Sequence, residues 1–567
     1  MEAIDWTGLG WLYLFFWYFS GITQALLIPS SGFIGFRSAF YMSLIWLAPV
    51  VLFPGFTQEI SAVIGIVLWA TSIVSMGYLA IYKTEFSQSV IFTIFETNFE
   101  ESREYLSQYL SLPLVCGAVV YTLAACLLWT HLRPVHLPLP CAMGLALFVL
   151  AINLGEPYVD YFRGKSDFES ATSKLYRRME PAAPWQLVVG YLQYRMQLAN
   201  VRKLLAKNSS LPPLENLVDT NGEVPRTLVL IIGESITSRR MSLYGYSRKT
   251  TPHLGALQEI GELSVFHDVI ASRPYTVEML RQSLSFANQE EPHRFLSEPN
   301  LMNLMKQAGY RSYWITNQQT MTHRNTLMTM FSQQADEARY LNQNRTQNAS
   351  SPDAVVLEPF SEALANPAPK KFIVVHLLGA HVRYSLRYPK EFEKFTGRDG
   401  VPENLSDSQA RTFNSYDNAV LYNDFILSRL IGLLSESWSN GFLLYFSDHG
   451  EEVFNDPAHE VLGRNEDKPT VDMFAVPFVL WRSPEWKRTH PSDFGPMLDR
   501  PYSNAHFIHT WSDLAGLVYD RFRPESSLVN PAFKPRVRWI GDPEVKNGLR
   551  DFDALARRQE AFRDRTP

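Results

Sequence analysis

The sequence predicts a chain of two parts: an α-helical transmembrane region of five helices, followed by an α/β domain with a mostly parallel central sheet. Two observations lead to this fold class. Nearly all the long apolar runs lie in the first 155 residues, whereas from Thr227 onward short apolar runs alternate with amphipathic stretches. With 567 residues, the chain has room for both a membrane region and a large globular domain.

Five uncharged stretches predict the transmembrane helices. Each has close to the ~20 residues with which a helix crosses about 30 Å of hydrocarbon, and five in succession argue against a buried core helix or a cleaved signal peptide. The stretches are Thr7–Ile28, Ser38–Phe56, Ser61–Tyr82, Leu112–Thr130 and Leu137–Leu154. We therefore expect residues 1–155 to form a five-helix transmembrane domain, with an external amphipathic loop at about 83–111.

The charges of the loops bear on the orientation in the membrane. The loop at 83–111 carries five glutamates against Lys83 and Arg103, which favours an external position. With an odd number of helices, the domain that follows the fifth helix would then be external too. The basic cluster at 163–178 argues for the opposite orientation, although large translocated domains often escape the positive-inside rule.

Cysteine content and net charge exclude few functions. Cys116, Cys126 and Cys141 all lie in predicted membrane helices, so no disulfide is expected in the C-terminal domain. The net charge of −5 is small for this length and gives no indication of nucleic-acid binding.

The remainder of the chain divides into a connecting segment and a globular domain. Residues 156–222 mix charged and apolar positions and include a polar Asn208-Ser-Ser-Leu-Pro-Pro stretch, which predicts a helical connection and a linker. Residues 223–567 form the globular domain. Continuous apolar strands separated by helices are typical of a mostly parallel sheet covered on both faces. The expected strands are 227–232, 312–315, 372–378, 442–446 and 476–481.

Two of these strands are followed by residues that can bind a metal ion. Glu234 follows the strand at 227–232, and Asp448 and His449 follow the strand at 442–446. The ligand crevice of an open α/β sheet lies beyond the carboxyl ends of its strands, so these side chains are expected to meet there. Two carboxylates and an imidazole suit a divalent cation such as zinc or manganese. Each acid alone could equally be a helix cap or a loop residue.

Thr276 is the candidate nucleophile. It follows the irregular Ser272-Arg-Pro-Tyr segment and stands where a helix begins, a position that favours an anion. A metal ion at the predicted site would lower the pKa of a nearby hydroxyl and make threonine a usable nucleophile. Alone, Thr276 could be an ordinary helix N-cap.

Several motifs in a fixed order carry a resemblance. The chain resembles the bacterial phosphoethanolamine transferases of the alkaline phosphatase superfamily, and in particular the branch that modifies the lipopolysaccharide core. The motifs are Val229–Ser235, Arg240–Pro252, Arg273–Thr276, His376–His381, Tyr416–Asp424 and Ser447–Glu452. The resemblance covers essentially the whole chain. It implies a sulfatase-like catalytic domain in the periplasm, carried by five helices in the bacterial inner membrane.

The resemblance also implies roles for individual residues. Glu234, the nucleophile Thr276, Asp448 and His449 would bind zinc. His381 and His459 would hold the phosphoryl group; without the resemblance, each would be read as a surface or packing histidine.

In the external loop, the resemblance places Thr97 and Glu101 near the head group of the substrate, although Glu101 could instead be a solvated acid on an amphipathic helix. The chain carries Thr93 at a position where its relatives carry asparagine. The segment Thr316–Thr322 lacks the lysine that lipid A-modifying relatives carry. Both departures leave the acceptor open.

The activity implied is transfer of phosphoethanolamine from phosphatidylethanolamine to lipopolysaccharide, at the core heptose or its phosphate, through a phosphoethanolamine-threonine intermediate. The alternatives are the same donor chemistry on lipid A or a periplasmic glycan, a phosphoglycerol transferase, and a non-catalytic membrane scaffold. A sulfatase would need a Cys/Ser-x-Pro-x-Arg motif, which the sequence around Thr276 does not supply.

Overall fold

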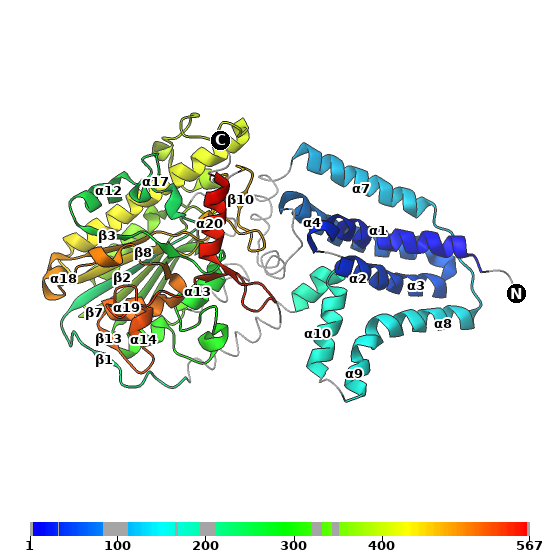
Figure 1. Ribbon diagram of the computed structural model, residues 1–567, viewed down its shortest axis with the longest axis horizontal. Coiled ribbons are helices and arrows are strands. Elements are labelled where there is room, and N and C mark those ends of the chain that lie inside the picture. Colours follow the sequence, from blue (N-terminus) through cyan, green and yellow to red (C-terminus); the bar gives the residue numbers. More distant parts are fainter. Residues whose placement is uncertain are drawn as a thin grey trace. The chain divides into compact units, whose positions relative to one another are not determined.

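The computed structural model describes residues 4–31, 33–82, 111–164, 168–192, 195, 211–319, 331–342, 351–456 and 458–563. The chain divides into two compact units (Figure 1). The first comprises residues 1–97 and 105–200, and the second comprises residues 98–104 and 201–567.

The first unit contains five helical segments that are long and apolar enough to cross a membrane, which confirms the predicted number: Trp6–Ile28, Gly35–Leu52, Pro54–Ile81, Leu112–Thr130 and Leu139–Phe162. Its helices are α1 (Trp6–Ser31), α2 (Phe33–Ser43), α3 (Leu47–Leu52), α4 (Thr57–Tyr82), α7 (Leu112–Thr130), α8 (Leu139–Leu150), α9 (Val159–Phe162) and α10 (Phe168–Met179). Hydrogen bonds between helices support the packing, because polar side chains in hydrocarbon need partners. Trp69 Nε1 donates to Thr122 Oγ1 at 2.9 Å, and the Ser72 and Tyr121 hydroxyls lie 2.8 Å apart.

The fifth segment extends beyond the apolar run that predicted it, from Leu154 to Phe162. Two acidic residues in this extension are paired with bases on α10. Arg178 Nη1 lies 2.6 Å from Glu156, and Lys174 Nζ lies 3.3 Å from Asp160. Both ion pairs lie where the sequence of this segment becomes charged.

The second unit is built on a mixed sheet. Within the described residues its strand order is β3-β11-β8-β2-β7-β5-β6. These strands are β2 (Arg226–Gly233), β3 (Leu263–Phe266), β5 (Arg311–Gln319), β6 (Glu337–Asn342), β7 (Lys370–His376), β8 (Gly441–Ser447) and β11 (Phe478–Arg482). The strands from β8 to β6 pair in parallel, and β11 is antiparallel to both of its neighbours. The five expected strands and the mostly parallel sheet are confirmed.

Helices cover both faces of this sheet (Figure 1). Alternate residues of β2 face two separate cores: Leu230 belongs to one and Ile231 to the other. The first core includes α13 (Thr276–Ser283), α14 (Leu301–Gln307) and α19 (Phe507–Leu514); the second includes α12 (Pro252–Glu259), α16 (Leu357–Ala365) and α17 (Asp407–Glu436). Burial on both faces explains why the strands are continuously apolar.

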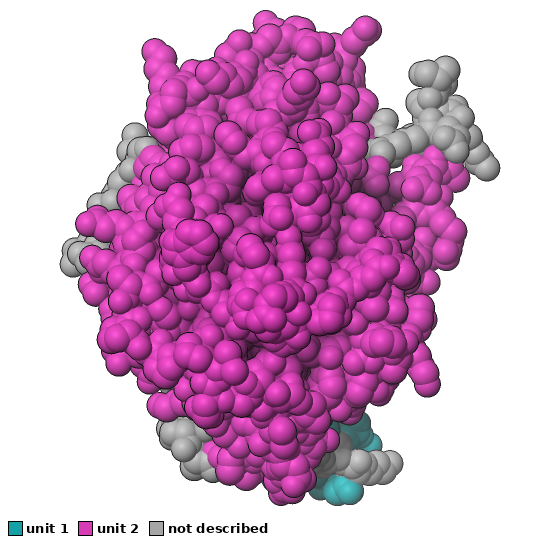
Figure 2. Space-filling model, turned by 90° about the vertical axis from the view of Figure 1, so that its left-hand side faces the viewer, with its two compact units in different colours: residues 1–97, 105–200 teal, residues 98–104, 201–567 magenta. Residues whose placement is uncertain are grey.

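Smaller elements surround the sheet, and Figure 2 shows one face of the unit they complete. Two-stranded pairs are formed by β1 (Val218–Asp219) with β13 (Leu517–Val518), β4 (Val269–Ile270) with β12 (Tyr502–Ser503), β9 (Glu452–Val453) with β10 (Leu462–Gly463), and β14 (Trp539–Ile540) with β15 (Arg550–Asp551). The remaining helices are α18 (Pro484–Thr489) and α20 (Phe552–Arg563). In the central sheet, Gly233 of β2 is in register with Ser447 of β8. The residues that follow these two strands therefore leave the same edge of the sheet side by side.

Candidate functional site

Glu234, Asp448 and His449 converge at this edge of the sheet. Their ligand atoms all lie within 4.8 Å of one another, and all three residues are buried. His449 Nε2 is 3.3 Å from Glu234 Oε1 and 3.3 Å from Asp448 Oδ2. Register between β2 and β8 thus produces a compact group of oxygen and nitrogen donors suited to one divalent cation.

Thr276 completes the group from the opposite side. It is the first residue of α13, and its hydroxyl donates to Glu234 Oε2 at 3.1 Å and lies 3.4 Å from His449 Nε2. The N-cap of α13 is Tyr275, and no side chain caps that end. The structure therefore does not support the ordinary N-cap role, because the hydroxyl faces the carboxylate and imidazole instead of its own helix.

The surrounding hydrogen bonds fix which ligand atoms face the centre. His449 Nδ1 lies 2.9 Å from the carbonyl oxygen of Gly450, and since a carbonyl can only accept, Nδ1 carries the proton and Nε2 the lone pair. Asp448 Oδ1 accepts from the backbone N–H of His449 at 2.7 Å and of Ser235 at 3.2 Å. Asp448 Oδ2 is buried, and no donor in the described part of the chain hydrogen-bonds to it.

The electrostatics of the group follow from burial and close charges. Burial and the charge of Glu234 raise the pKa of Asp448 well above its usual value. Burial also opposes ionisation of Glu234, but the hydrogen bond and charge of His449, with the charges of His381 and Arg464, hold its pKa well below normal. Burial and the charge of Arg464 lower the pKa of His449. A carboxylate must lose its proton to bind a metal, so a cation at this group would displace the proton that the raised pKa of Asp448 favours.

Two side chains that the sequence did not single out also contact the group. Gln318, near the end of β5, donates to Glu234 Oε2 at 3.2 Å and to the carbonyl of Leu377 at 2.8 Å. Arg464, directly after β10, lies 2.5 Å from His449 Nε2 through Nη1 and 3.2 Å from Glu451 Oε2 through Nε. Neither position has a sequence signal, because isolated polar residues at strand ends and in loops have no periodicity.

The two predicted phosphoryl-binding histidines lie outside the group formed by Glu234, Thr276, Asp448 and His449. His381 is 7% exposed and close enough to Glu234 for its charge to lower the pKa of that carboxyl. His459 is half-buried, and its Nδ1 lies 2.7 Å from the carbonyl of Phe454 in its own loop. Thr97 and Glu101 fall outside the described residues.

The loop of His381 is held by a buried carboxylate. Asp353 accepts from the backbone N–H groups of Leu378 and Gly379, each at 2.8 Å. Gly379 has a φ of +55°, and a Cβ there would lie 2.4 Å from the carbonyl oxygen of Glu234. Glycine is required at this position because the histidine loop passes directly over the Glu234 backbone.

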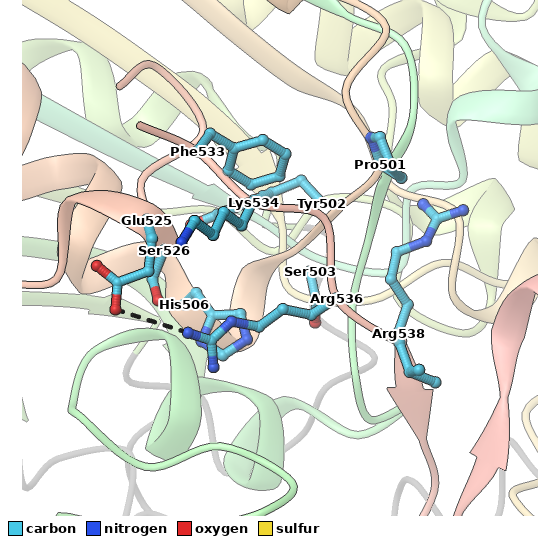
Figure 3. Close-up of a pocket in the computed structure, with 11 residues that line it drawn as sticks. Pro501, Tyr502, Ser503, His506, Glu525, Ser526, Phe533, Lys534, Arg536 and Arg538 are labelled. Carbon is cyan, nitrogen blue, oxygen red and sulfur yellow. Dashed lines mark ion pairs between the residues drawn. The ribbon is translucent and has the colours of Figure 1, made fainter. Parts of the chain in front are cut away.

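A separate pocket lies among residues 501–538 (Figure 3). Four of its eleven lining residues are basic, and among them Lys534, Arg536 and His506 lie close to Glu525. Arg536 lies 3.8 Å from Glu525. The residues that line this pocket are distinct from those of the candidate metal group.

Comparison with known proteins finds relatives that align over almost the whole chain. The Sulfatase family model matches residues 226–517. The chain is 52% identical to the phosphoethanolamine transferase EptC of Escherichia coli (strain K12), over 97% of this chain and 96% of that protein. It is 53% identical to the phosphoethanolamine transferase CptA of Salmonella typhimurium (strain LT2), over 98% of this chain and 97% of that protein.

Solved structures of phosphoethanolamine transferases are also similar to this chain. The crystal structure of the C-terminal periplasmic domain of EptC from E. coli, in complex with Zn, is 56% identical, with a TM-score of 0.60 over 61% of this chain and 97% of that one. The integral membrane protein EptA from Neisseria meningitidis has the same fold, with a TM-score of 0.60 at 20% identity over 93% of this chain and 98% of that one. The family predicted from the motifs is confirmed: this chain belongs to the phosphoethanolamine transferases, enzymes whose catalytic domain has the sulfatase fold.

Proposed function

We propose that this enzyme transfers phosphoethanolamine from phosphatidylethanolamine to lipopolysaccharide, at the core heptose or its phosphate, and that Thr276 carries the group between the two steps. The observation that carries the proposal is the position of the Thr276 hydroxyl, 3.1 Å from Glu234 and 3.4 Å from His449 in a buried donor group. The relatives with over half their residues identical are named phosphoethanolamine transferases.

We propose zinc as the cation, held by Glu234, Thr276, Asp448 and His449. The His449 Nε2 lone pair, the buried Asp448 Oδ2 and the nearby Glu234 carboxylate are donors of the kind that zinc binds, and the Thr276 hydroxyl would supply a fourth ligand. The related EptC domain was crystallised with Zn, which supports the same choice here. Bound zinc would lower the pKa of a neighbouring hydroxyl and offset negative charge on phosphoryl oxygens.

In the first step, Thr276 Oγ1 forms a bond to the phosphorus of the lipid. The bond between phosphorus and the diacylglycerol oxygen breaks, and that oxygen leaves with the proton that Thr276 gives up. The start of α13 directs backbone N–H groups at the phosphoryl group, which favours its negative charge. His381, near Glu234, and His459 are proposed to hold the phosphoryl oxygens.

In the second step, an oxygen of the acceptor attacks the same phosphorus, the Thr276 Oγ1–P bond breaks, and the acceptor proton returns to Thr276. Thr97 and Glu101 are proposed to contact the ethanolamine head group. The apolar helices of the first unit and the periplasmic domains of the relatives support an inner-membrane enzyme with its catalytic unit in the periplasm.

A labelling experiment tests this function. Full-length protein in detergent is incubated with zinc and phosphatidylethanolamine labelled in the ethanolamine, and intact-protein and peptide mass spectrometry locate the adduct. We expect one phosphoethanolamine on Thr276 in the wild type and none in Thr276→Ala. An adduct that persists in Thr276→Ala would contradict the assignment of Thr276 as the nucleophile.

The donor and acceptor are tested separately. Glycerophosphate on Thr276, formed from labelled phosphatidylglycerol, would show a phosphoglycerol transferase instead. For the acceptor, mass spectrometry of intact lipopolysaccharide from cells with and without the enzyme locates the missing phosphoethanolamine. We expect it on the core; a loss confined to lipid A or to a periplasmic glycan would assign the alternative acceptor.

A further inference from the structure

Arg464 contacts the candidate centre but has no role in the function proposed above. It follows the β9–β10 hairpin, and its side chain is 16% exposed, whereas those of Glu234 and His449 are at most 1% exposed. Its Nη1 lies 2.5 Å from His449 Nε2 and 3.8 Å from Glu234 Oε1. Arg464 is therefore the most solvent-facing of these three contacting side chains.

The other end of the guanidinium is anchored. Arg464 Nε lies 3.2 Å from Glu451 Oε2, and Glu451 Oε1 accepts a hydrogen bond from the Tyr384 hydroxyl at 3.1 Å. Glu451 and Tyr384 are themselves buried. Because the guanidinium is a rigid plane, this anchor holds the whole group beside the centre.

A guanidinium and a zinc ion cannot use the same His449 lone pair. Zinc binds imidazole nitrogen at about 2 Å, so a cation on Nε2 and a guanidinium nitrogen in contact with Nε2 would overlap and repel. With a cation on His449, Arg464 Nη1 would no longer contact Nε2, and the guanidinium could act as a donor to another group. Thr276 Oγ1 lies 3.4 Å from the same His449 Nε2, so the guanidinium and the threonine hydroxyl meet at one atom of the centre.

We propose that Arg464 binds the phosphoryl oxygens of the lipid donor and stabilises the charge that develops on them during transfer; this inference rests on the proposed function. Arginine presents planar, paired N–H donors that match two phosphate oxygens, and it stays charged throughout. Glu451 and Tyr384 are positioning residues that set the guanidinium plane.

Arg464→Gln tests the proposal in the full-length enzyme. Formation of the Thr276 adduct from phosphatidylethanolamine in detergent micelles is followed in a single turnover at saturating zinc. We expect a rate lower by about 10²-fold or more, the usual loss when one donor to a developing oxyanion is removed. Arg464→Lys keeps the charge but not the paired donors and should recover only part of that rate. Arg488→Gln, which removes an exposed arginine paired with Glu485 on α18, is the matched control and should react like the wild type.

Two measurements without turnover separate substrate binding from a structural role. Zinc content and the zinc-induced rise in melting temperature should be unchanged in Arg464→Gln. The affinity of the zinc-loaded protein for inorganic phosphate, measured by calorimetry, should fall by about tenfold or more, as expected for loss of a charge-assisted contact.

Two results would overturn the inference. One is an adduct rate and phosphate affinity in Arg464→Gln equal to those of the wild type. The other is a loss of zinc content, or of the zinc-induced rise in melting temperature, in Arg464→Gln, which would mean that Arg464 acts through the metal site. Absence of any adduct in the wild type would instead refute the proposed function, so the two failures are distinguishable.

Discussion

At the scale of single residues, the candidate centre depends on the backbone immediately after Glu234. Ser235 has a φ of +60°, a left-handed conformation that a non-glycine residue rarely adopts. Tyr416 holds it there: its hydroxyl donates to the carbonyl of Ser235 at 2.7 Å and accepts from the N–H of Thr237 at 3.0 Å. A buried tyrosine thereby sets the direction of the Glu234 carboxylate.

Tyr416→Phe should weaken zinc binding as well as stability. The change leaves two buried backbone groups without their partner, at a cost of about 1–3 kcal/mol each in the free energy of unfolding. Relaxation of Ser235 should also lower zinc affinity, measured by competition with a chromogenic chelator. Tyr502→Phe, which removes a buried hydroxyl bonded to Thr510, is the control and should lower stability alone. Unchanged zinc affinity in Tyr416→Phe would contradict this role.

Sequence reasoning at this scale could find residues whose position follows from an element. Glu234, Asp448 and His449 follow predicted strands, and the position of the ligand crevice in α/β sheets predicts that these three side chains meet. The sequence predicts Thr276 only at the start of a helix, and the family resemblance joins it to the other three. Gln318, Arg464 and Tyr416 could not be found in this way, because their roles depend on where an irregular loop or a distant helix packs.

Among the elements, α17 is the main support of the segment that follows β2. Asp417 lies 2.6 Å from Arg240 and 2.8 Å from Arg248, and all three side chains are buried. Asp424, further along the helix, accepts from the N–H groups of His253 and Leu254, each at 2.9 Å, and so caps α12. The Tyr416–Asp424 motif therefore serves the scaffold around the centre.

The cap gives this element a defined pH dependence. Burial raises the pKa of Asp424 from 3.8 to about 7, despite the hydrogen bonds from Leu254 and His253. A raised pKa means that the folded state binds the proton more tightly, so this contribution to stability is full below about pH 4 and is lost as the pH rises through 7.

Asp424→Asn should remove that dependence. Relative to the variant, the wild type should lose on the order of a few kcal/mol in the free energy of unfolding between pH 4 and 8. Denaturant unfolding of both proteins across this range measures the difference. Asp407→Asn, at the exposed start of the same helix, is the control. Parallel pH profiles for wild type and Asp424→Asn would contradict the assignment.

Apolar runs in the sequence predict the central strands of the sheet but not its edge strands. The five expected strands are central or buried, whereas β3 and β6 at the two edges of the sheet were not predicted. β6 reads Glu-Ala-Arg-Tyr-Leu-Asn and is mostly half-buried, so its sequence has no continuous apolar run. β3 has only four residues. An edge strand is recognisable only once its neighbour is in place.

For the molecule as a whole, the candidate metal joins parts that are far apart in the sequence. Its proposed ligands come from the ends of β2 and β8 and from the start of α13. A cation that binds only the folded arrangement stabilises it by mass action, by about 2.7 kcal/mol at a hundred times the dissociation constant.

Zinc should therefore raise the melting temperature of the enzyme by several degrees over the chelated form. Differential scanning calorimetry of the full-length protein in detergent measures the shift. Asp448→Asn removes one proposed ligand and should abolish the dependence on zinc while leaving a cooperative transition. A zinc-dependent shift that survives in Asp448→Asn would place the ion elsewhere.

The position of the cysteines has a practical consequence. The sequence contains three cysteines, and all of them, Cys116, Cys126 and Cys141, lie in apolar helices of the first unit and form no disulfide. The catalytic unit therefore needs no oxidative folding and can be produced in a reducing cytosol. Thiol-directed labels added to the native protein can attach only to the membrane unit, because the catalytic unit contains no cysteine.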